Sequence, residues 1–292
     1  MTTPGLTRIP LPPARPAAIF RLVVPESDDE AIFRLARRFD LAGSLDTGTL
    51  HRDARHSTYV EGPYRLILHH ASGGFRLHDT TRWQVDDGES HVTLEDEAAV
   101  AIARRHLHEA GIASAEDHEV LRVSRLHVAV AEPATGSTEE RIIDVAVTFH
   151  RLVDKIPVLG PGGKITVYVD HERRVTGVDS IGRAIEGVVE PEAVLRPPES
   201  VLAEVERAWS DDRNGLVSID DMVFGYFEAD WDEPQAYLQP AYVLLSTVTA
   251  TEGLFAGRQV TRSVHPVPAA VDPPGPLMAP PPVLEPPSSS RE

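Results

Sequence analysis

In the stretch between residues 144 and 179, hydrophobic and polar residues alternate strictly from Val145 to His150 and from Ile165 to Asp170. The apolar positions of this alternation are Val145, Val147, Phe149, Ile165, Val167 and Val169. A period of two places successive side chains on opposite faces of a strand, so that one face is buried and the other meets water. The stretch therefore predicts three successive antiparallel strands. We expect the last three apolar positions to face a helix, and Thr166, Tyr168 and Asp170 to face outward.

Three other segments repeat apolar residues with the period of a helix. The first begins with a capping box formed by Ser27 and Glu30. The second starts near Thr93 and ends at Gly111, and the third has Pro198 at its start, where a missing N–H costs nothing. The positions predicted to be buried are Ile32, Leu35, Ala36 and Phe39 in the first helix, Ala99, Ile102, Ala103, Leu107 and Ala110 in the second, and Val201, Leu202, Val205, Ala208 and Trp209 in the third.

Each predicted helix is followed by predicted strands, which indicates a loose threefold repeat. The expected fold class is therefore α+β, with antiparallel sheets that are each packed by a helix. The predicted divisions are a proline-rich N-terminal tail (1–17), an N-terminal α+β unit (18–92), an α+β domain (93–262) made of two units (93–190 and 191–262), and a proline-rich C-terminal tail (263–292). Both tails are predicted to be disordered, because a proline-rich composition cannot pack a core.

The loop and strands that follow residue 155 carry a known pattern. Its residues are Ile156-Pro157-Val158, Gly162-Gly163, Val167-Tyr168-Val169-Asp170 and Val175, with a closing part at Gly225-Tyr226 and from Tyr237 to Tyr242. The pattern resembles PepSY-like and FTP-like modules of protease propeptides and the YycI/YycH type of regulatory protein. The chain departs from it at Lys155 and Arg173, near which the family pattern has glycine. The resemblance implies cystatin-like helix-on-sheet units and a protein that regulates a partner.

The chain is acidic, with a formal net charge of -17 at pH 7, and it contains no cysteine. This charge argues against nucleic acid and anionic membranes as partners, because both are polyanions. The lack of cysteine excludes disulfides, cysteine zinc sites and iron–sulfur clusters. No apolar run reaches the length of about 18 residues that a membrane span needs, and no signal peptide is visible. We therefore expect a cytoplasmic protein without a membrane span.

Histidines and acidic residues are the candidates for metal chemistry. Six of the 13 histidines lie between residues 51 and 91, but the neighbours His69 and His70 would point to opposite faces of a strand. The loop from Ser210 to Asp221 resembles an EF-hand loop, although Ser and Asp stand where such loops have Asp and Glu. We therefore expect no metal and no other cofactor.

Two further motifs have a structural interpretation. The segment Gly160-Pro-Gly-Gly-Lys164 lacks the spacing of a phosphate-binding loop, and no predicted helix follows it. We interpret it as a hairpin loop. Asp179 and Ser180 are neighbours in a predicted strand and would point apart, which argues against a catalytic triad with His171.

Aromatic side chains are the remaining signal, because Trp and Tyr dominate protein interfaces. The candidate partner-binding residues are Trp83, Tyr168, Trp231, Tyr237 and Tyr242. The favoured hypothesis is a non-enzymatic binding or regulatory protein, such as a propeptide-like inhibitor or scaffold, that acts on a partner protein. The alternative is a small-molecule enzyme of cyclase or isomerase type, with His and Asp acid–base residues in a pocket under the sheet. A polar, histidine-lined pocket above about 300 Å³ would favour the enzyme, whereas exposed aromatics and open strand edges would favour the binding protein.

Overall fold

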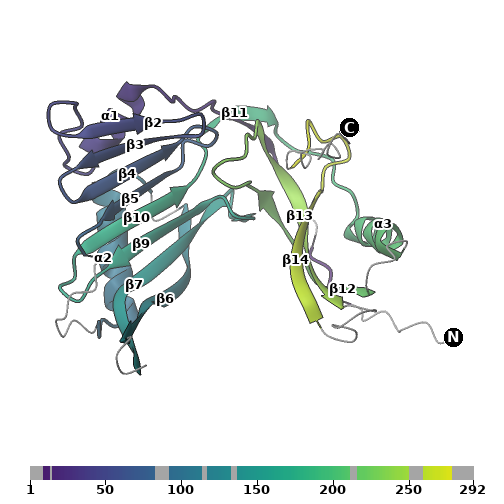
Figure 1. Cartoon of the computed structure of the whole chain (residues 1–292). Helices are drawn as coiled ribbons and strands as arrows, with labels where there is room; N and C mark the ends of the chain where they lie inside the picture. The colour runs from purple at the N-terminus through teal and green to yellow at the C-terminus, as the bar shows by residue number, and fades with distance from the viewer. Residues whose placement is uncertain are drawn as a thin grey trace, which may run out of the picture.

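The structure is a computed structural model that describes residues 9–13, 15–82, 92–113, 117–132, 137–210, 216–249 and 259–277. Within these residues the fold is a large mixed β-sheet of fourteen strands with three short helices (Figure 1). The strands are β1 (Ile19–Leu22), β2 (Thr49–Arg52), β3 (His56–Glu61), β4 (Tyr64–His69), β5 (Phe75–Asp79), β6 (His118–Glu132), β7 (Ser137–Val153), β8 (Ile156–Leu159), β9 (Lys164–Val169), β10 (Val175–Ile181), β11 (Ile185–Glu190), β12 (Leu216–Phe227), β13 (Tyr237–Thr249) and β14 (Gln259–Pro268). The helices are α1 (Asp29–Arg37), α2 (Asp96–Glu109) and α3 (Pro198–Ser210).

The predicted α+β fold class is wrong, because the strands form one hydrogen-bonded sheet and not separate helix-on-sheet units. Their order is β11-β1-β13-β12-β8-β7-β9-β10-β5-β4-β3-β2, with β14 on β13 and β6 on β7. The strands β6, β7, β12 and β13 have 15, 17, 12 and 13 residues, whereas the helices have only nine, 14 and 13. The fold is therefore β-rich, with helices as a partial cover.

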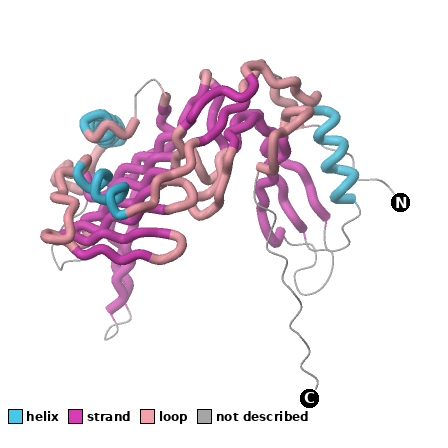
Figure 2. Tube along the Cα trace, turned by 90° about the horizontal axis from the view of Figure 1, so that it is seen from above, coloured by secondary structure: helices cyan, strands magenta, loops and turns pink. Residues whose placement is uncertain are grey.

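The sheet has two halves that carry their helices on separate faces. The first half contains the neighbouring strands β7, β9, β10, β5, β4, β3 and β2, and α1 and α2 cover one of its faces (Figure 1). In the second half, α3 covers one face of β12 and β13. Figure 2 shows from above that α3 lies at the opposite end of the molecule from α1 and α2. The first-half core contains Ile32 and Leu66 together with Val147 and Val167. One core therefore crosses the division predicted between residues 92 and 93.

The strand β8 connects the two halves. The strand β7 pairs antiparallel with β9 over Val145 to His150 and then with β8 at Leu152 and Val153. The end of β8 leaves this hairpin and pairs in parallel with the end of β12. A four-residue strand with a central proline has no alternation long enough to detect, so the sequence predicted only a loop here.

The predicted register of β9 is confirmed on its buried side. Val167 is fully buried and packs with Ala103 of α2 in the first-half core, while Tyr168 is half-buried on the other face. The prediction for Asp170 is wrong, because this residue is 4% exposed. Its Oδ1 accepts hydrogen bonds from the backbone N–H groups of Glu172 and Arg174, both at 2.9 Å. These bonds hold the turn between β9 and β10.

Three non-glycine residues adopt the left-handed conformation in the turns of this region. Asp154 and Lys155 have φ angles of 51° and 61° in the tight turn between β7 and β8, and Arg173 has a φ of 63° in the next turn. Glycine is the usual residue at such positions. Two of them, Lys155 and Arg173, are where the chain departs from the PepSY-like pattern. At the second turn, the Asp170 carboxylate accepts hydrogen bonds from the N–H groups of Glu172 and Arg174, the two neighbours of Arg173.

The helices lie close to their predicted positions. The N-cap of α1 is Asp28, whose side chain accepts from the Ala31 N–H at 2.8 Å, one residue after the predicted Ser27. The second helix starts at Asp96, three residues later than predicted, and Gly111 follows its end with a φ of 63°. The third starts at Pro198 as predicted.

At both ends of the chain, residues that were predicted to belong to disordered tails are part of the fold. The strand β14 reaches Pro268 and Leu277 is 5% exposed, so the disordered tail predicted from residue 263 is wrong up to residue 277. Proline is tolerated in β14 because this strand pairs only with β13 and forms an edge. At the other end, Ile9 and Leu11 pack partly against the second-half core. Residues 1–8 and 278–292 lie outside the described residues.

Candidate functional site

A buried ion pair lies where the two halves meet. Arg183 is in the link between β10 and β11, Glu228 follows β12, and the two residues are 2% and 0% exposed. The Arg183 guanidinium lies 3.4 Å from Glu228 Oε1, and the Arg183 backbone N–H donates to the same oxygen at 2.8 Å. The guanidinium also donates to the carbonyl oxygens of Ala229, Asp230 and Glu233. Burial raises the pKa of Glu228, and the charge and hydrogen bonds of Arg183 oppose this rise. Arg183 therefore stabilises the ionised form of the Glu228 carboxyl.

The glycines between β8 and β9 leave room for this ion pair. A Cβ at Gly162 would lie 2.6 Å from Glu228 Cγ, and a Cβ at Gly163 would lie 2.4 Å from Val158 Cγ1. Gly163 also has a φ of 64°, which other residues rarely adopt. The Gly162 N–H donates to the Glu228 carbonyl at 3.0 Å. The Gly-Pro-Gly-Gly-Lys motif is therefore a packing loop that encloses Glu228.

A polar network around Asp179 occupies the face of the first-half sheet opposite to α2. Asp179 Oδ1 lies 2.6 Å from His78 Nε2, and its Oδ2 accepts from Arg76 at 3.2 Å and from the Tyr168 hydroxyl at 3.3 Å. Burial alone would raise the pKa of Asp179, but the His78 hydrogen bond and the charges of His78 and Arg76 lower it. Burial, and then the Asp179 charge, raise the pKa of Tyr168 to about 12. At neutral pH, Asp179 is therefore an anion and Tyr168 a neutral donor.

The loop between β12 and β13 places Trp231 on this network. The Trp231 ring stacks on His69 with 4.8 Å between the ring centroids, and the Arg76 guanidinium lies 4.5 Å from the Trp231 centroid. Asp232 Oδ1 lies 2.8 Å from His69 Nδ1. The other ring nitrogen of His69 is buried and has no hydrogen bond within the described part of the chain. Because Trp231 and Asp232 come from the second half, this loop is a second contact between the halves.

Replacing Asp179 with asparagine is expected to lower the free energy of unfolding by about 1.5–3 kcal/mol at pH 7, the usual value of hydrogen bonds to a charged group. The folded state lowers the pKa of Asp179 below its ordinary value of 3.8. Its stabilisation is therefore complete above about pH 4 and is lost as the pH falls through the folded-state pKa. Urea unfolding at several pH values should show the native protein and the variant converging in acid.

The matched control is Asp46→Asn, because Asp46 is exposed and makes no hydrogen bond or ion pair with the described residues. This variant should stay within about 0.5 kcal/mol of the native protein at every pH. A constant difference between the native protein and Asp179→Asn from neutral pH to acid would contradict the anionic role of Asp179.

An apolar pocket of about 540 Å³ lies on the second half of the sheet. Met222 and Tyr242 face α3, so alternation turns Val223 and Val243 to the opposite face. This face is turned toward the first half, because α3 lies on the outer side of β13 and β14 (Figure 1). The described residues that line the pocket are Leu159, Gly160, Pro161, Val223, Phe227, Ala229, Asp230, Glu233, Val243, Leu245, Val264 and Pro266.

The pocket combines exposed aliphatic surface with an acidic rim. Leu245 is 39% and Val264 is 55% exposed, and the two residues lie opposite each other on the paired strands β13 and β14. Asp230 and Glu233 form the rim. The Oε2 atom of Glu233 is buried and accepts no hydrogen bond from any described residue. The charge of Glu233 interacts with that of the nearby Arg183, and Asp230 and Glu233 give the lining its two acidic side chains.

The structure separates the five aromatic residues predicted to bind a partner. Trp83 lies outside the described residues. Tyr168 and Trp231 belong to the network between the halves, and Tyr237 is half-buried with Arg21 at 5.9 Å from its ring. The prediction for Tyr242 is wrong, because this residue is fully buried and its hydroxyl donates to the Arg196 carbonyl at 2.9 Å. Its aromatic ring fills the core under α3.

Sequence inspection missed Arg183, Glu228 and Glu233. Glu228 ends the otherwise apolar and aromatic run Met222–Phe227, and a charge in such a place is a signal of a paired buried group. Its partner is far away in sequence, so no spacing rule connects the two.

Metal coordination finds no support within the described residues. They contain no group of three or more His, Asp or Glu side chains arranged to hold an ion. Five residues of the EF-hand-like loop, 211–215, lie outside the described residues, and Asp221 lies in the strand β12. Among the described residues, no helix has the length and apolar character that a membrane crossing would require.

Comparisons with known proteins leave the family open. No family model matches the chain, and no curated protein matches it at a significant level. Among solved structures, an uncharacterized protein from Eubacterium rectale is similar, with a TM-score of 0.48 and 13% sequence identity. The similarity covers 88% of this chain and 84% of that chain. A likeness this distant assigns no function.

Proposed function

We propose that this protein is a non-enzymatic binding or regulatory protein whose partner is another protein. The partner would insert a segment with apolar side chains and a neighbouring lysine or arginine into the apolar pocket of the second half. In this way the protein would act as an inhibitor or scaffold of that partner.

The pocket is the observation that carries this proposal. Its surface is aliphatic, and Leu245 and Val264 would be removed from water by an apolar segment. Charge complementarity supports the basic neighbour, because Asp230 and Glu233 are the only charged residues among the described residues that line the pocket, and both are acidic. The net charge of -17 would favour the approach of a basic partner.

A small-molecule enzyme is the second candidate function. Its support is the pair His78–Asp179, with 2.6 Å between Nε2 and Oδ1, which is a geometry suited to acid–base chemistry. However, the described residues that line the apolar pocket include no histidine. The binding function is favoured because neither His78 nor Asp179 is among the described residues that line the apolar pocket.

The proposal is tested with two labelled synthetic peptides that share an apolar centre. One is flanked by lysines and the other by glutamates, and fluorescence anisotropy measures their binding to the full-length protein. The lysine peptide is expected to bind at least about tenfold more tightly, a difference of about 1.4 kcal/mol. Val264→Asp should weaken binding of the lysine peptide at least tenfold, because it places a charge on the apolar surface. Glu233→Gln should reduce the preference for lysine.

Matched controls separate the pocket from general attraction to an acidic protein. Val188→Asp adds the same charge at a residue that is 59% exposed on β11, and Glu192→Gln removes an exposed charge outside the pocket. Neither should change binding by more than about twofold. Equal binding by the two peptides would contradict the proposal. Self-association that is lost in Val264→Asp would instead identify a second copy as the occupant.

A further inference from the structure

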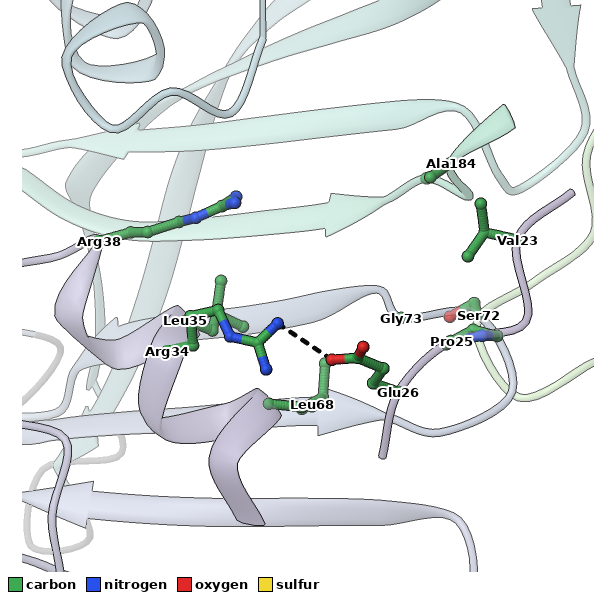
Figure 3. Close-up of a pocket in the computed structure, with 12 residues that line it drawn as sticks. Val23, Pro25, Glu26, Arg34, Leu35, Arg38, Leu68, Ser72, Gly73 and Ala184 are labelled. Atoms are coloured by element: carbon green, nitrogen blue, oxygen red, sulfur yellow. Dashed lines mark hydrogen bonds and ion pairs between the residues drawn. The ribbon is translucent and has the colours of Figure 1, made fainter. Parts of the chain in front are cut away.

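A second pocket, of about 240 Å³, lies beside the link between β10 and β11. Its walls come from segments that are far apart in sequence: the link from β1 to α1, the helix α1 itself, the turn between β4 and β5, and the start of the link to β11 (Figure 3). Its described lining residues are different from those of the apolar pocket. A ligand here would therefore be independent of the proposed partner.

The charged residues of this pocket leave one positive charge unmatched. Arg34 and Arg38 line it together with a single acidic residue, Glu26. The Arg34 guanidinium donates to Glu26 at 3.0 Å, as the dashed line in Figure 3 marks. The Arg38 side chain extends from α1 toward Ala184 (Figure 3) and forms no hydrogen bond or ion pair with any residue that the structure describes. Arg38, which is exposed, therefore carries the positive charge that this pocket leaves without a partner among the described residues.

The remaining walls combine a hydroxyl group with an apolar floor. Ser72 is 2% exposed, and its Oγ accepts the Gly74 N–H at 3.0 Å. The described residues offer no acceptor for its hydroxyl proton, which is therefore available to a ligand oxygen. Leu35 and Leu68 form the floor, with Val23 on the opposite side (Figure 3).

From this arrangement we infer that the pocket binds a small molecule with one carboxylate and a short aliphatic chain. The Arg38 guanidinium binds the carboxylate through two parallel hydrogen bonds, a geometry that guanidinium and carboxylate share. The aliphatic chain covers the floor at Leu35 and Leu68. A singly charged head group matches the single unmatched charge, whereas a doubly charged phosphate does not.

The inference is tested by NMR titration of the full-length protein with hexanoate, hexanol and hexyl phosphate. Hexanoate is expected to bind at least about tenfold more tightly than hexanol, because only hexanoate pairs with Arg38. Arg38→Gln should weaken hexanoate binding by about tenfold or more and leave hexanol binding unchanged. Arg37→Gln is the matched control: Arg37 lies on the same helix, pairs with Glu30 and does not line the pocket, so hexanoate binding should not change.

Three results would overturn the inference. One is hexanoate binding that is equally tight in Arg38→Gln and in the native protein, and another is the absence of binding by hexanoate at millimolar concentration. Tighter binding of hexyl phosphate than of hexanoate would overturn the assignment to a singly charged carboxylate. None of these results depends on the peptide experiment, because Val264→Asp and Glu233→Gln change a different pocket.

Discussion

Replacing Arg183 with methionine is expected to lower the free energy of unfolding by about 3–5 kcal/mol, the usual cost of removing one partner of a buried ion pair. Methionine leaves the Glu228 carboxyl fully buried without its cation. It also removes the donors to the carbonyl oxygens of Ala229, Asp230 and Glu233. Urea unfolding followed by circular dichroism measures the change.

Two further variants isolate the cause of this loss. Arg105→Met is the matched control, because Arg105 is exposed on α2, and it should stay within about 0.5 kcal/mol of the native protein. The double variant Arg183→Met with Glu228→Leu should recover part of the loss, because it removes the unpaired buried charge. A loss below about 1 kcal/mol for Arg183→Met alone would show that the ion pair does not hold the two halves together.

Val167→Asp is expected to prevent folding, with a loss of more than about 4 kcal/mol. Val167 is 0% exposed and lies in the first-half core with Ala103 and Val147. The aspartate would have no cation among its core neighbours, so its charge would be buried without compensation. The far-ultraviolet circular dichroism spectrum and a thermal melt are the measurements.

The same substitution at an exposed strand position is the control for this effect. Val188 is 59% exposed on β11, and Val188→Asp should change the free energy of unfolding by less than about 0.5 kcal/mol. Thr166 is a poor control, because it is half-buried and pairs with Asp179, so an aspartate there would face a like charge across the strands. A folded Val167→Asp protein with a native melting temperature would contradict the register of β9.

The relation between sequence and site is clearest at Asp179. The sequence predicted that Asp179 lies in a strand. Asp179 and Ser180 are neighbours in β10, which agrees with the argument that their side chains point apart. Its partners were not visible, since His78 and Arg76 lie in β5 and reach Asp179 only through the pairing of β5 with β10. Strand pairing over long separations leaves no periodic signal in the chain, so this network had to come from the structure.

The apolar pocket shows the same limit. The exposure of Val243 and Leu245 depends on which face of the strands α3 covers. The sequence predicts the helix α3, but it does not indicate which face of the strands this helix covers. For the same reason Tyr242 appeared as a candidate surface residue, although its place in the alternation turns it into the core under α3.

The helices, the alternation of β7 and β9 and the acidic character of the protein followed from the sequence alone. The helices and the alternation depend on residues a few positions apart, whose spacing sets which side chains share a face. The structure was needed to show that all described strands join one sheet, that Arg183 meets Glu228, and that one apolar face of the second half stays open. These features depend on pairing and packing between distant segments, where the cost of closing a long loop is repaid by contacts that no local pattern encodes.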